Sequence, residues 1–177
     1  KFTGDEDTDM EIECDYSYDY ARWASMYSSL SISDSDPSTA WAEGVKGPGI
    51  GEVVITKVLG LEGLGIRSGF QKNADLYAKN ARPRKVRVWA LAAGHMNIGQ
   101  YDMYYADVKA LAYRDSELED LMDWQPLYLP SVKAPATTIS GMDDNQDTLW
   151  FVAVQILSVY PGSKWEDCCI SDIGIMQ

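Results

Sequence analysis

The sequence has little of several residue types on which common protein chemistries depend. It contains one histidine, His95, so His-rich zinc sites and most histidine-based acid–base catalysis have too few residues to be built. The 15 Lys and Arg residues face 27 Asp and Glu residues, which gives a formal net charge of −12. Phosphate contacts need a cationic surface, so nucleic acid is excluded as a general partner. No apolar run approaches the roughly 18 to 20 residues that a membrane-spanning helix requires.

Cysteine is also scarce. Cys14, Cys168 and Cys169 have no zinc-binding spacing and form no Cys-x-x-Cys pair. In an oxidising compartment, one disulfide and one free thiol is the simplest arrangement. Because the geometry of neighbouring residues disfavours a bond between Cys168 and Cys169, we expect Cys14 to pair with one of them, and the choice between the two stays open.

The length and the charge distribution predict one domain with an acidic extension. The 177 residues are 46% hydrophobic, which is enough for a core. Between Lys1 and Tyr20 there are eight acidic residues and one basic residue, so we expect residues 1–17 to be a solvated leader and residues 18–177 to be a β-domain. In contrast, Arg67 to Arg87 carries seven basic residues and one acid. The first residue is not Met and no signal peptide follows, so we expect a trimmed, mature product.

The residue pattern favours strands over helices. Alternating or β-branched apolar runs predict strands at four places, and the segment Ala106–Tyr113 fits a strand or a short helix. The one helical pattern covers Asp115–Asp123. Six Trp and eleven Tyr also favour β-structure and partly wet binding faces. We therefore expect an all-β sandwich or jelly roll. The four predicted strands are Glu52–Val58, Lys85–Leu91, Leu149–Val159 and Ile170–Ile175.

One acidic motif, Asp34-Ser35-Asp36-Pro37-Ser38-Thr39, has three interpretations. It resembles the Asp-x-Asp-x-Thr/Ser nucleophile motif of magnesium-dependent, haloacid-dehalogenase-type phosphatases, with Asp143-Asp144 as the acidic pair. That chemistry requires a parallel sheet with crossover helices, which this chain does not predict. The motif also suits a hard cation such as Ca²⁺, which prefers carboxylate, hydroxyl and carbonyl oxygens. The third interpretation is a plain turn without metal.

Three blocks of the sequence resemble one family. DSDPSTAWAEGVKGPGIGE at Asp34–Glu52 resembles the Asp-Gly-Asn-x-Ser-Thr-x-Trp loop of discoidin domains, also called F5/8 type C or galactose-binding-like domains. Ile66–Trp89 and Val159–Ile175 resemble motifs of the branch that is attached to bacterial NAD glycohydrolases and surface lipoproteins. Ser68-Gly69-Phe70 replaces the Asn-Gly-Tyr of that branch, and Cys168-Cys169 replaces a Thr and a variable residue.

The resemblance implies an eight-stranded antiparallel jelly-roll β-sandwich and a set of site residues. It implies a structural Ca²⁺ held by Asp34, Asp36, Thr39 and Asp172, although Asp172 is one methylene shorter than the Glu of relatives. It implies close termini, which suits the disulfide from Cys14. The implied glycan ligands combine an aromatic platform with polar side chains, and they are Phe70, Lys72, Tyr77, Asn80, Arg82, Trp41 and Glu43. Trp41, Asn80 and Arg82 also have a structural interpretation, as a buried plug and as anchors of a turn.

The resemblance also implies a function. We expect a non-catalytic carbohydrate-binding module of a secreted or surface protein, with a glycan or cell-surface partner and no nucleic acid. A structural or protein-binding accessory domain of a lipoprotein, with a lipid anchor in the full precursor, is the alternative. The phosphatase built on Asp34 and Asp36 is a more remote one. The expected location is extracellular, at the cell surface or periplasmic.

Overall fold

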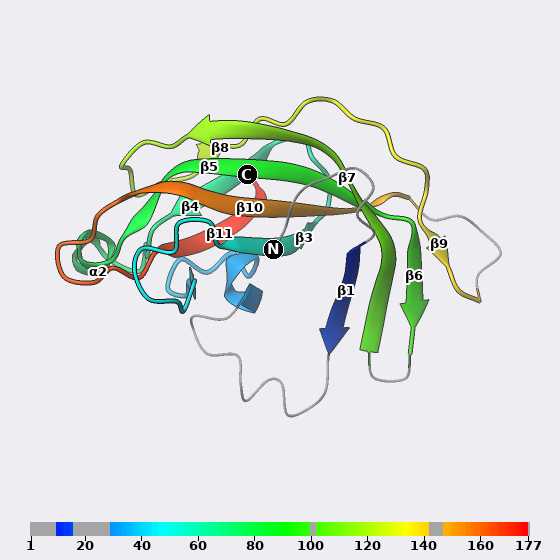
Figure 1. The fold of residues 1–177 in the computed structure, drawn as a ribbon, viewed down its shortest axis with the longest axis horizontal. Coiled ribbons are helices and arrows are strands. Elements are labelled where there is room, and N and C mark those ends of the chain that lie inside the picture. The colour runs from blue at the N-terminus through cyan, green and yellow to red at the C-terminus, as the bar shows by residue number, and fades with distance from the viewer. Residues whose placement is uncertain (1–9, 16–28, 100–101, 142–146, 177) are drawn as a thin grey trace.

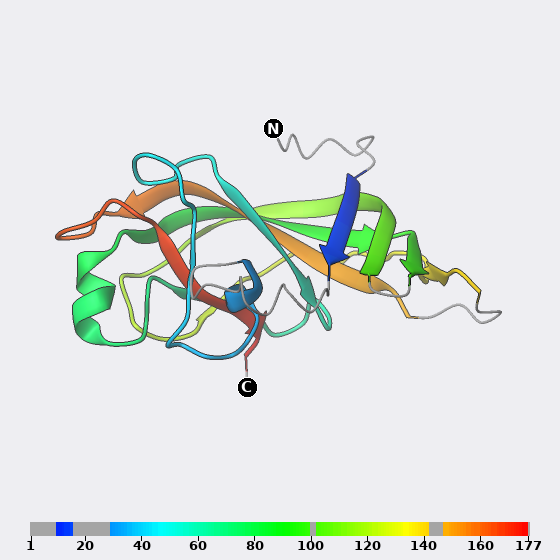
Figure 2. The ribbon, with the colours of Figure 1, turned by 90° about the horizontal axis from the view of Figure 1, so that it is seen from below.

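A computed structural model describes residues 10–15, 29–99, 102–141 and 147–176, and the side chains of 31–99, 103–141 and 147–176. The described residues form two sheets (Figures 1 and 2). In chain order, the elements are β1 (Met10–Asp15), η1 (Ser29–Ile32), β2 (Trp41–Ala42), β3 (Val53–Val58), β4 (Leu64–Ser68), α2 (Ala74–Lys79), β5 (Arg82–Ala93), β6 (His95–Ile98), β7 (Asp102–Glu117), β8 (Gln125–Pro126), β9 (Thr138–Ile139), β10 (Leu149–Tyr160) and β11 (Cys169–Ile175).

The larger sheet has the order β3-β10-β5-β7-β6-β9, with β1 added to β7, and the smaller has the order β2-β11-β4-β8. Pairing is antiparallel throughout the named strands except between β6 and β9. The all-β class with two facing sheets is therefore confirmed. A count of eight strands is not confirmed, because several of the described strands have only two residues.

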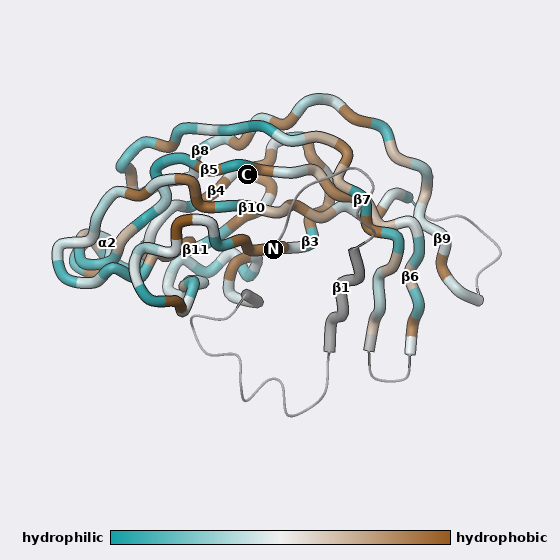
Figure 3. The backbone as a smooth tube through the Cα atoms, viewed as in Figure 1, coloured by the Kyte–Doolittle hydropathy of each residue, from teal (hydrophilic) through white to brown (hydrophobic). Residues whose placement is uncertain are grey.

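The core between the sheets is formed by every second residue along the strands, whose side chains face inward. Val86 and Val88 of β5, with Val152 and Val154 of β10, face Ile66 and other apolar residues of the smaller sheet, and all are buried. Alternation with a period of two leaves the intervening residues on the outer face. Figure 3 shows the resulting change between hydrophobic and hydrophilic segments along these strands.

A long, bent hairpin forms a second apolar cluster on the outer face of the larger sheet. Strands β5 and β6 are separated only by Gly94, and both pair with β7. Asp107 of β7 has φ = 53°, and a Cβ on Gly94 would lie 2.9 Å from the Cβ of Asp107. The bend brings Tyr105 against Phe151, edge to face at 4.9 Å between ring centroids. The short distance between residue 94 and Asp107 explains why residue 94 is a glycine.

The structure confirms the four predicted strands as β3, β5, β10 and β11, and it resolves the segment from Ala106 as part of strand β7. The predicted helix over Asp115–Asp123 is wrong. Its first residues end β7, and Leu118 is buried while its N–H donates to Arg84 O at 2.7 Å. The apolar spacing therefore reflects a strand followed by a packed loop.

Helix α2 was not predicted, although its ends carry recognisable signals. Asn73 is its N-cap, and the Asn73 Oδ1 accepts from Leu76 N at 2.9 Å. Asp75 lies in the first turn and Lys79 in the last, as the helix dipole favours. Six residues were too few to give an apolar period.

The expected leader overlaps a strand. Within residues 1–17 the structure describes β1, which pairs with β7. The rest of that segment lies outside the described residues, as do Asp143 and Asp144, so the boundary at residue 17 stays a prediction.

Candidate functional site

Most of the expected glycan ligands lie inside the protein. Phe70 and Trp41 are 1% and 9% exposed, and Tyr77, Asn80 and Arg82 are also buried. The ring of Phe70 packs in a small cluster with Ala40 and Cys169. These positions support the structural interpretation of the side chains, because an apolar platform that binds a sugar must reach the surface.

Two expected ligands are more exposed. Lys72 is exposed at the start of the α2 region. Glu43 is half-buried, and its Oε2 accepts from Cys168 N at 2.7 Å, so it ties the β2 segment to the start of β11. Burial raises the pKa of Glu43 above its usual range. Only Lys72 is therefore presented to solvent in the way the prediction required.

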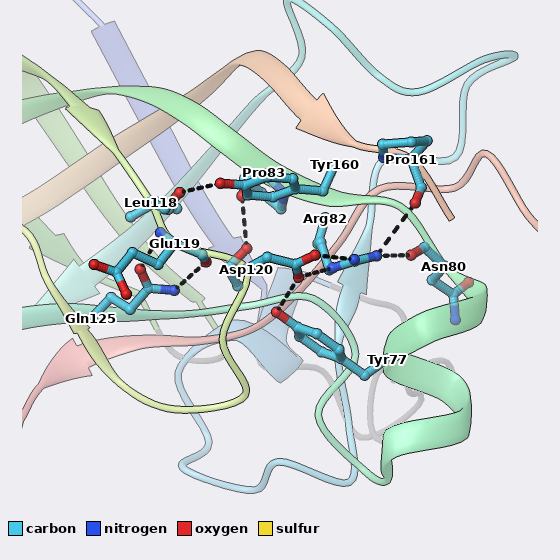
Figure 4. A network of polar contacts seen from close by, with 11 residues as sticks. Tyr77, Asn80, Arg82, Pro83, Leu118, Glu119, Asp120, Gln125, Tyr160 and Pro161 are labelled. Carbon is cyan, nitrogen blue, oxygen red and sulfur yellow. Dashed lines mark hydrogen bonds and ion pairs between the residues drawn. The ribbon is translucent and has the colours of Figure 1, made fainter. Parts of the chain in front are cut away.

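Arg82 is the centre of a polar network at one end of the sandwich (Figure 4). Its Nε and Nη2 donate to Asp120 Oδ1 and Oδ2, both at 2.5 Å, and Tyr77 donates its hydroxyl to Asp120 Oδ1 at 2.9 Å. The guanidinium also lies 4.8 Å from the centroid of the Tyr77 ring. Its Nη1 donates to the carbonyls of Asn80 and Pro161. This bidentate, charge-assisted geometry fixes the position of Asp120.

The network changes the protonation behaviour of its members. Hydrogen bonds from Arg82 hold the pKa of Asp120 below its usual range, and the hydrogen bonds with Asp120 raise the pKa of Arg82. Burial, and then the bond to Asp120, raises the pKa of Tyr77. All three side chains therefore keep their ordinary charge states near neutral pH.

The anchored loop, residues 118–125, is held at several further points. Gln125 Oε1 accepts from Glu119 N at 2.6 Å, and Gln125 Nε2 donates to Glu119 O at 2.9 Å (Figure 4). Tyr160 donates its hydroxyl to Leu118 O at 3.0 Å. Strand β8 then pairs with β4. The loop is thus a rigid wall beside the last residues of β7.

A groove of about 470 Å³ lies between this wall and the edge of β7. Tyr128 is 64% exposed, and Leu121 is also exposed. The ring of Trp124 lies 5.1 Å from the Arg67 guanidinium. Charged and polar groups of β7 form the opposite side. The lining residues are Arg114, Asp115, Ser116, Glu117, Leu118, Glu119, Leu121, Trp124, Gln125, Pro126 and Tyr128.

The acidic groups of β7 in the groove are largely balanced by cations of β5. Arg87 Nε and Nη2 donate to Asp115 Oδ1 and Oδ2 at 2.6 and 3.1 Å, which holds the pKa of Asp115 below its usual range. Arg84 contacts Glu117 at 3.2 Å. The groove therefore combines exposed aromatic surface, fixed charges and a strand edge.

The expected calcium loop is held together by its own hydrogen bonds. Thr39 Oγ1 donates to Asp34 Oδ2 at 2.7 Å, and Asp36 Oδ1 accepts from Ser38 N at 2.8 Å, which lowers the pKa of Asp36. Burial and the nearby charge of Asp34 raise the pKa of Asp172 to about 6. The structure thus brings Asp34 and Asp172 together, while Asp36 turns toward the backbone. No three His, Cys, Asp or Glu side chains cluster as metal ligands within the described ranges. Calcium stays a prediction.

The two neighbouring cysteines are buried, and both are free thiols in the structure. Burial raises the pKa of Cys169 to about 12 and raises that of Cys168 further. Cys14 lies in β1, opposite Met103 of β7, and its side chain is outside the described set. The disulfide from Cys14 stays a prediction.

Sequence reasoning did not find the residues that form the groove. Asp120 and Tyr128 lie in segments that match none of the three family blocks, and the wrong helix over residues 115–123 concealed the wall. A tyrosine, Tyr128, between Pro126 and Pro130 was the one signal that the sequence offered.

The family model described as the NAD glycohydrolase translocation F5/8 type C domain matches residues 7–176. The chain belongs to this family. Searches of the curated proteins and of the solved structures found no match. In the part of this F5/8 type C domain that the structure describes, no helix is long and apolar enough to cross a membrane.

Proposed function

We propose that this F5/8 type C domain is a non-catalytic accessory module that recognises glycans in the groove beside β7. The observation that supports this most directly is the exposed ring of Tyr128 over a groove of about 470 Å³. That volume lies within the range of small-ligand sites, roughly 300 to 1,000 Å³.

The composition of the groove suits a sugar. A pyranose has one apolar face, which packs on an aromatic ring, and a rim of hydroxyls that require donors and acceptors. Tyr128 and Trp124 offer rings, while Arg114 and Glu119 offer a donor and an acceptor. The Arg82–Asp120 pair keeps the loop wall in place before a ligand arrives, so little ordering cost remains to be met on binding.

A glycan array followed by titration calorimetry would test the proposal. We expect binding of at least one sugar class at micromolar to millimolar concentration. Tyr128→Ala should weaken it roughly tenfold or more, since the sugar loses its aromatic contact. Leu59→Ala is the matched control, because Leu59 is also an exposed apolar side chain but lines a different pocket. Failure of every sugar class with an intact fold would refute glycan recognition.

A protein-binding accessory role is the alternative, and a second pocket favours it. This pocket, of about 590 Å³, lies between the β3–β4 loop and residues 129–132 and is lined mostly by apolar side chains, with Leu59 95% exposed at its rim. The family description suggests a NAD glycohydrolase as partner. If titration with such an enzyme shows binding that Leu59→Ser weakens and Tyr128→Ala leaves unchanged, this role replaces the first.

The family description also supports a proposal about where the protein is located. A translocation domain of a NAD glycohydrolase fits an extracellular, cell-surface or periplasmic location, with or without a lipid anchor on the precursor. The phosphatase alternative loses its structural basis, because Asp34 and Asp36 lie in a turn of an all-β sandwich. Wild type incubated with a phosphate ester and Mg²⁺ should show no more turnover than the Asp34→Asn variant does.

A further inference from the structure

Among the described residues that line the groove beside β7, one side chain is basic, that of Arg114. Arg84, Lys85 and Arg87 belong to the neighbouring strand β5, and each contacts an acid of β7 at 2.6 to 3.7 Å. Arg114 itself is exposed, and no ion pair joins it to a described side chain. Its guanidinium is therefore available to a ligand.

The register of β7 places Arg114 on the inner face of the larger sheet. Arg114 lies opposite Val88, and Ser116 lies opposite Val86. Directly opposed residues of an antiparallel pair share a face, and both valines are buried in the core between the sheets. Arg114 is therefore on the side of β7 that faces the smaller sheet and the loop wall, and Tyr128 lines the same groove.

The groove also has one acid without a basic partner among the described side chains. Asp115 and Glu117 are paired with cations of β5, but Glu119 is exposed and has no ion pair there. Glu119 belongs to the loop wall, whereas Arg114 belongs to β7. A ligand that spans the groove therefore meets a cation on the strand side and a hydrogen-bond acceptor on the loop side.

A sugar with a single carboxylate matches this arrangement. The carboxylate fits the planar guanidinium of Arg114, which can donate two parallel hydrogen bonds. The sugar hydroxyls can donate to Glu119, and the apolar face of the ring can pack on Tyr128. A ligand with many negative charges is disfavoured, because the protein has a net charge of −12 and the groove has one free cation among its lining residues.

We propose that the groove beside β7 selects sugars that carry a carboxylate, and that Arg114 binds this group. Resting on the proposed function, the inference names acidic sugar units, the uronic and sialic acids, as the ligand class of that groove. Arg114 discriminates between acidic and neutral sugars, whereas Tyr128 supplies a contact that both kinds share.

Matched sugar pairs test this selectivity in NMR titrations of the full chain. The methyl glycosides of glucuronate and galacturonate differ from those of glucose and galactose only at C6, where a carboxylate replaces a hydroxymethyl group. The methyl glycoside of N-acetylneuraminate and its methyl ester form a third pair. We expect the acid of at least one pair to bind roughly tenfold more tightly than its neutral counterpart. Salt at about 1 M should reduce this difference, because it shortens the Debye length to about 3 Å.

Substitutions on β7 assign the selectivity to one residue. Arg114→Gln should bring the affinity for the acid down to that for the neutral sugar, and Arg114→Lys should keep part of the difference, since an ammonium retains the charge but loses the planar fork. Lys109→Gln is the matched control, because Lys109 is also an exposed cation of β7 but lines a different pocket. It should keep full selectivity. Urea midpoints of the three variants should match that of wild type.

The outcomes separate this inference from the proposed function. Equal affinities for acidic and neutral sugars, both weakened by Tyr128→Ala, would overturn the acid selectivity and leave glycan recognition intact. Selectivity that survives Arg114→Gln would also overturn the inference, because the carboxylate is then bound elsewhere. If acetate binds as tightly as the sugar acids and Tyr128→Ala has no effect, the groove captures anions only, and both hypotheses fail. Both also fail if the folded protein binds no sugar at all.

Discussion

The two sides of the anchored loop, residues 118–125, use polar residues in opposite ways. On one side, Arg82 and Tyr77 donate hydrogen bonds to Asp120, and Arg82 is buried. On the other side, Tyr128 and Arg114 are exposed at the groove. The first side fixes the position of the loop, and the second presents a surface that this position shapes.

The comparison shows why a family motif need not mark a contact surface. The segment from Tyr77 to Arg82 belongs to a block that resembles the family, yet its residues anchor a loop that lies outside all three of these blocks. The side chains that line the groove are different from those that form the anchor. Experiments that separate stability from binding test this division directly.

The largest effect is expected from Asp120→Ala. The change leaves the buried Arg82 guanidinium without its carboxylate and the Tyr77 hydroxyl without its acceptor. Because removal of one partner leaves a buried charge unpaired, we expect a loss of about 3 kcal/mol in the free energy of unfolding. Urea denaturation would measure it.

Glu117→Ala is the control for this change, since its pair with Arg84 is exposed on both sides. It should cost under about 0.5 kcal/mol. Equal losses in the two variants would mean that the pair of buried Arg82 with the partly exposed Asp120 contributes no more than a surface ion pair, and the contrast between the two sides would disappear.

The strands were predictable because their signal is local. Runs such as Val53 to Val58 alternate or branch at Cβ, and this fits a pleated, half-buried surface wherever the partner strand lies. The anchor was not predictable, because Asp120 is 38 residues from Arg82 in the sequence. No residue near Arg82 in the sequence indicates that its partner is a protein carboxylate and not a ligand.

The groove was hidden for a related reason. A strand edge and a loop wall form it, and edges depend on sheet order, which a single sequence does not encode locally. The apolar spacing of Leu118, Leu121 and Met122 imitates a helix, but Leu118 packs in the core while Leu121 and Met122 are exposed. Tertiary packing overrides the periodic pattern there.

Calcium would give a third region whose stability depends on a ligand, unlike the anchor network. If the loop at Asp34 binds Ca²⁺ with Asp172, free calcium at 100 times its Kd should raise the free energy of unfolding by about 2.7 kcal/mol. Differential scanning fluorimetry with and without chelator would show this as a fall in Tm. If the Tm falls, Asp34→Asn should abolish that fall. An unchanged Tm at saturating chelator would leave the loop held by its hydrogen bonds alone.

The anchor should also impose a pH dependence. Arg82 lowers the pKa of Asp120, so the unfolded chain binds the proton more readily than the folded chain does. The stabilisation is therefore complete above the unfolded pKa, near 3.8, and is lost as the pH falls through the lower folded value. Urea midpoints of wild type and Asp120→Asn should converge on acidification from pH 5 to pH 2. A constant difference between the two urea midpoints would mean that the Arg82–Asp120 pair does not contribute to acid unfolding.

The smallest effect compares one hydroxyl on each side of the loop. Tyr77→Phe removes the bond to Asp120 from a buried ring, and Tyr128→Phe removes a hydroxyl from an exposed one. The first should cost about 1 kcal/mol of stability, and the second should leave stability within about 0.5 kcal/mol. Sugar affinity should follow the reverse order if the hydroxyl of Tyr128 contacts the ligand. A Tyr77→Phe variant with full stability and weakened sugar binding would place the contact surface on the anchored side instead, because only a side chain that reaches the ligand can alter affinity while leaving the fold unchanged.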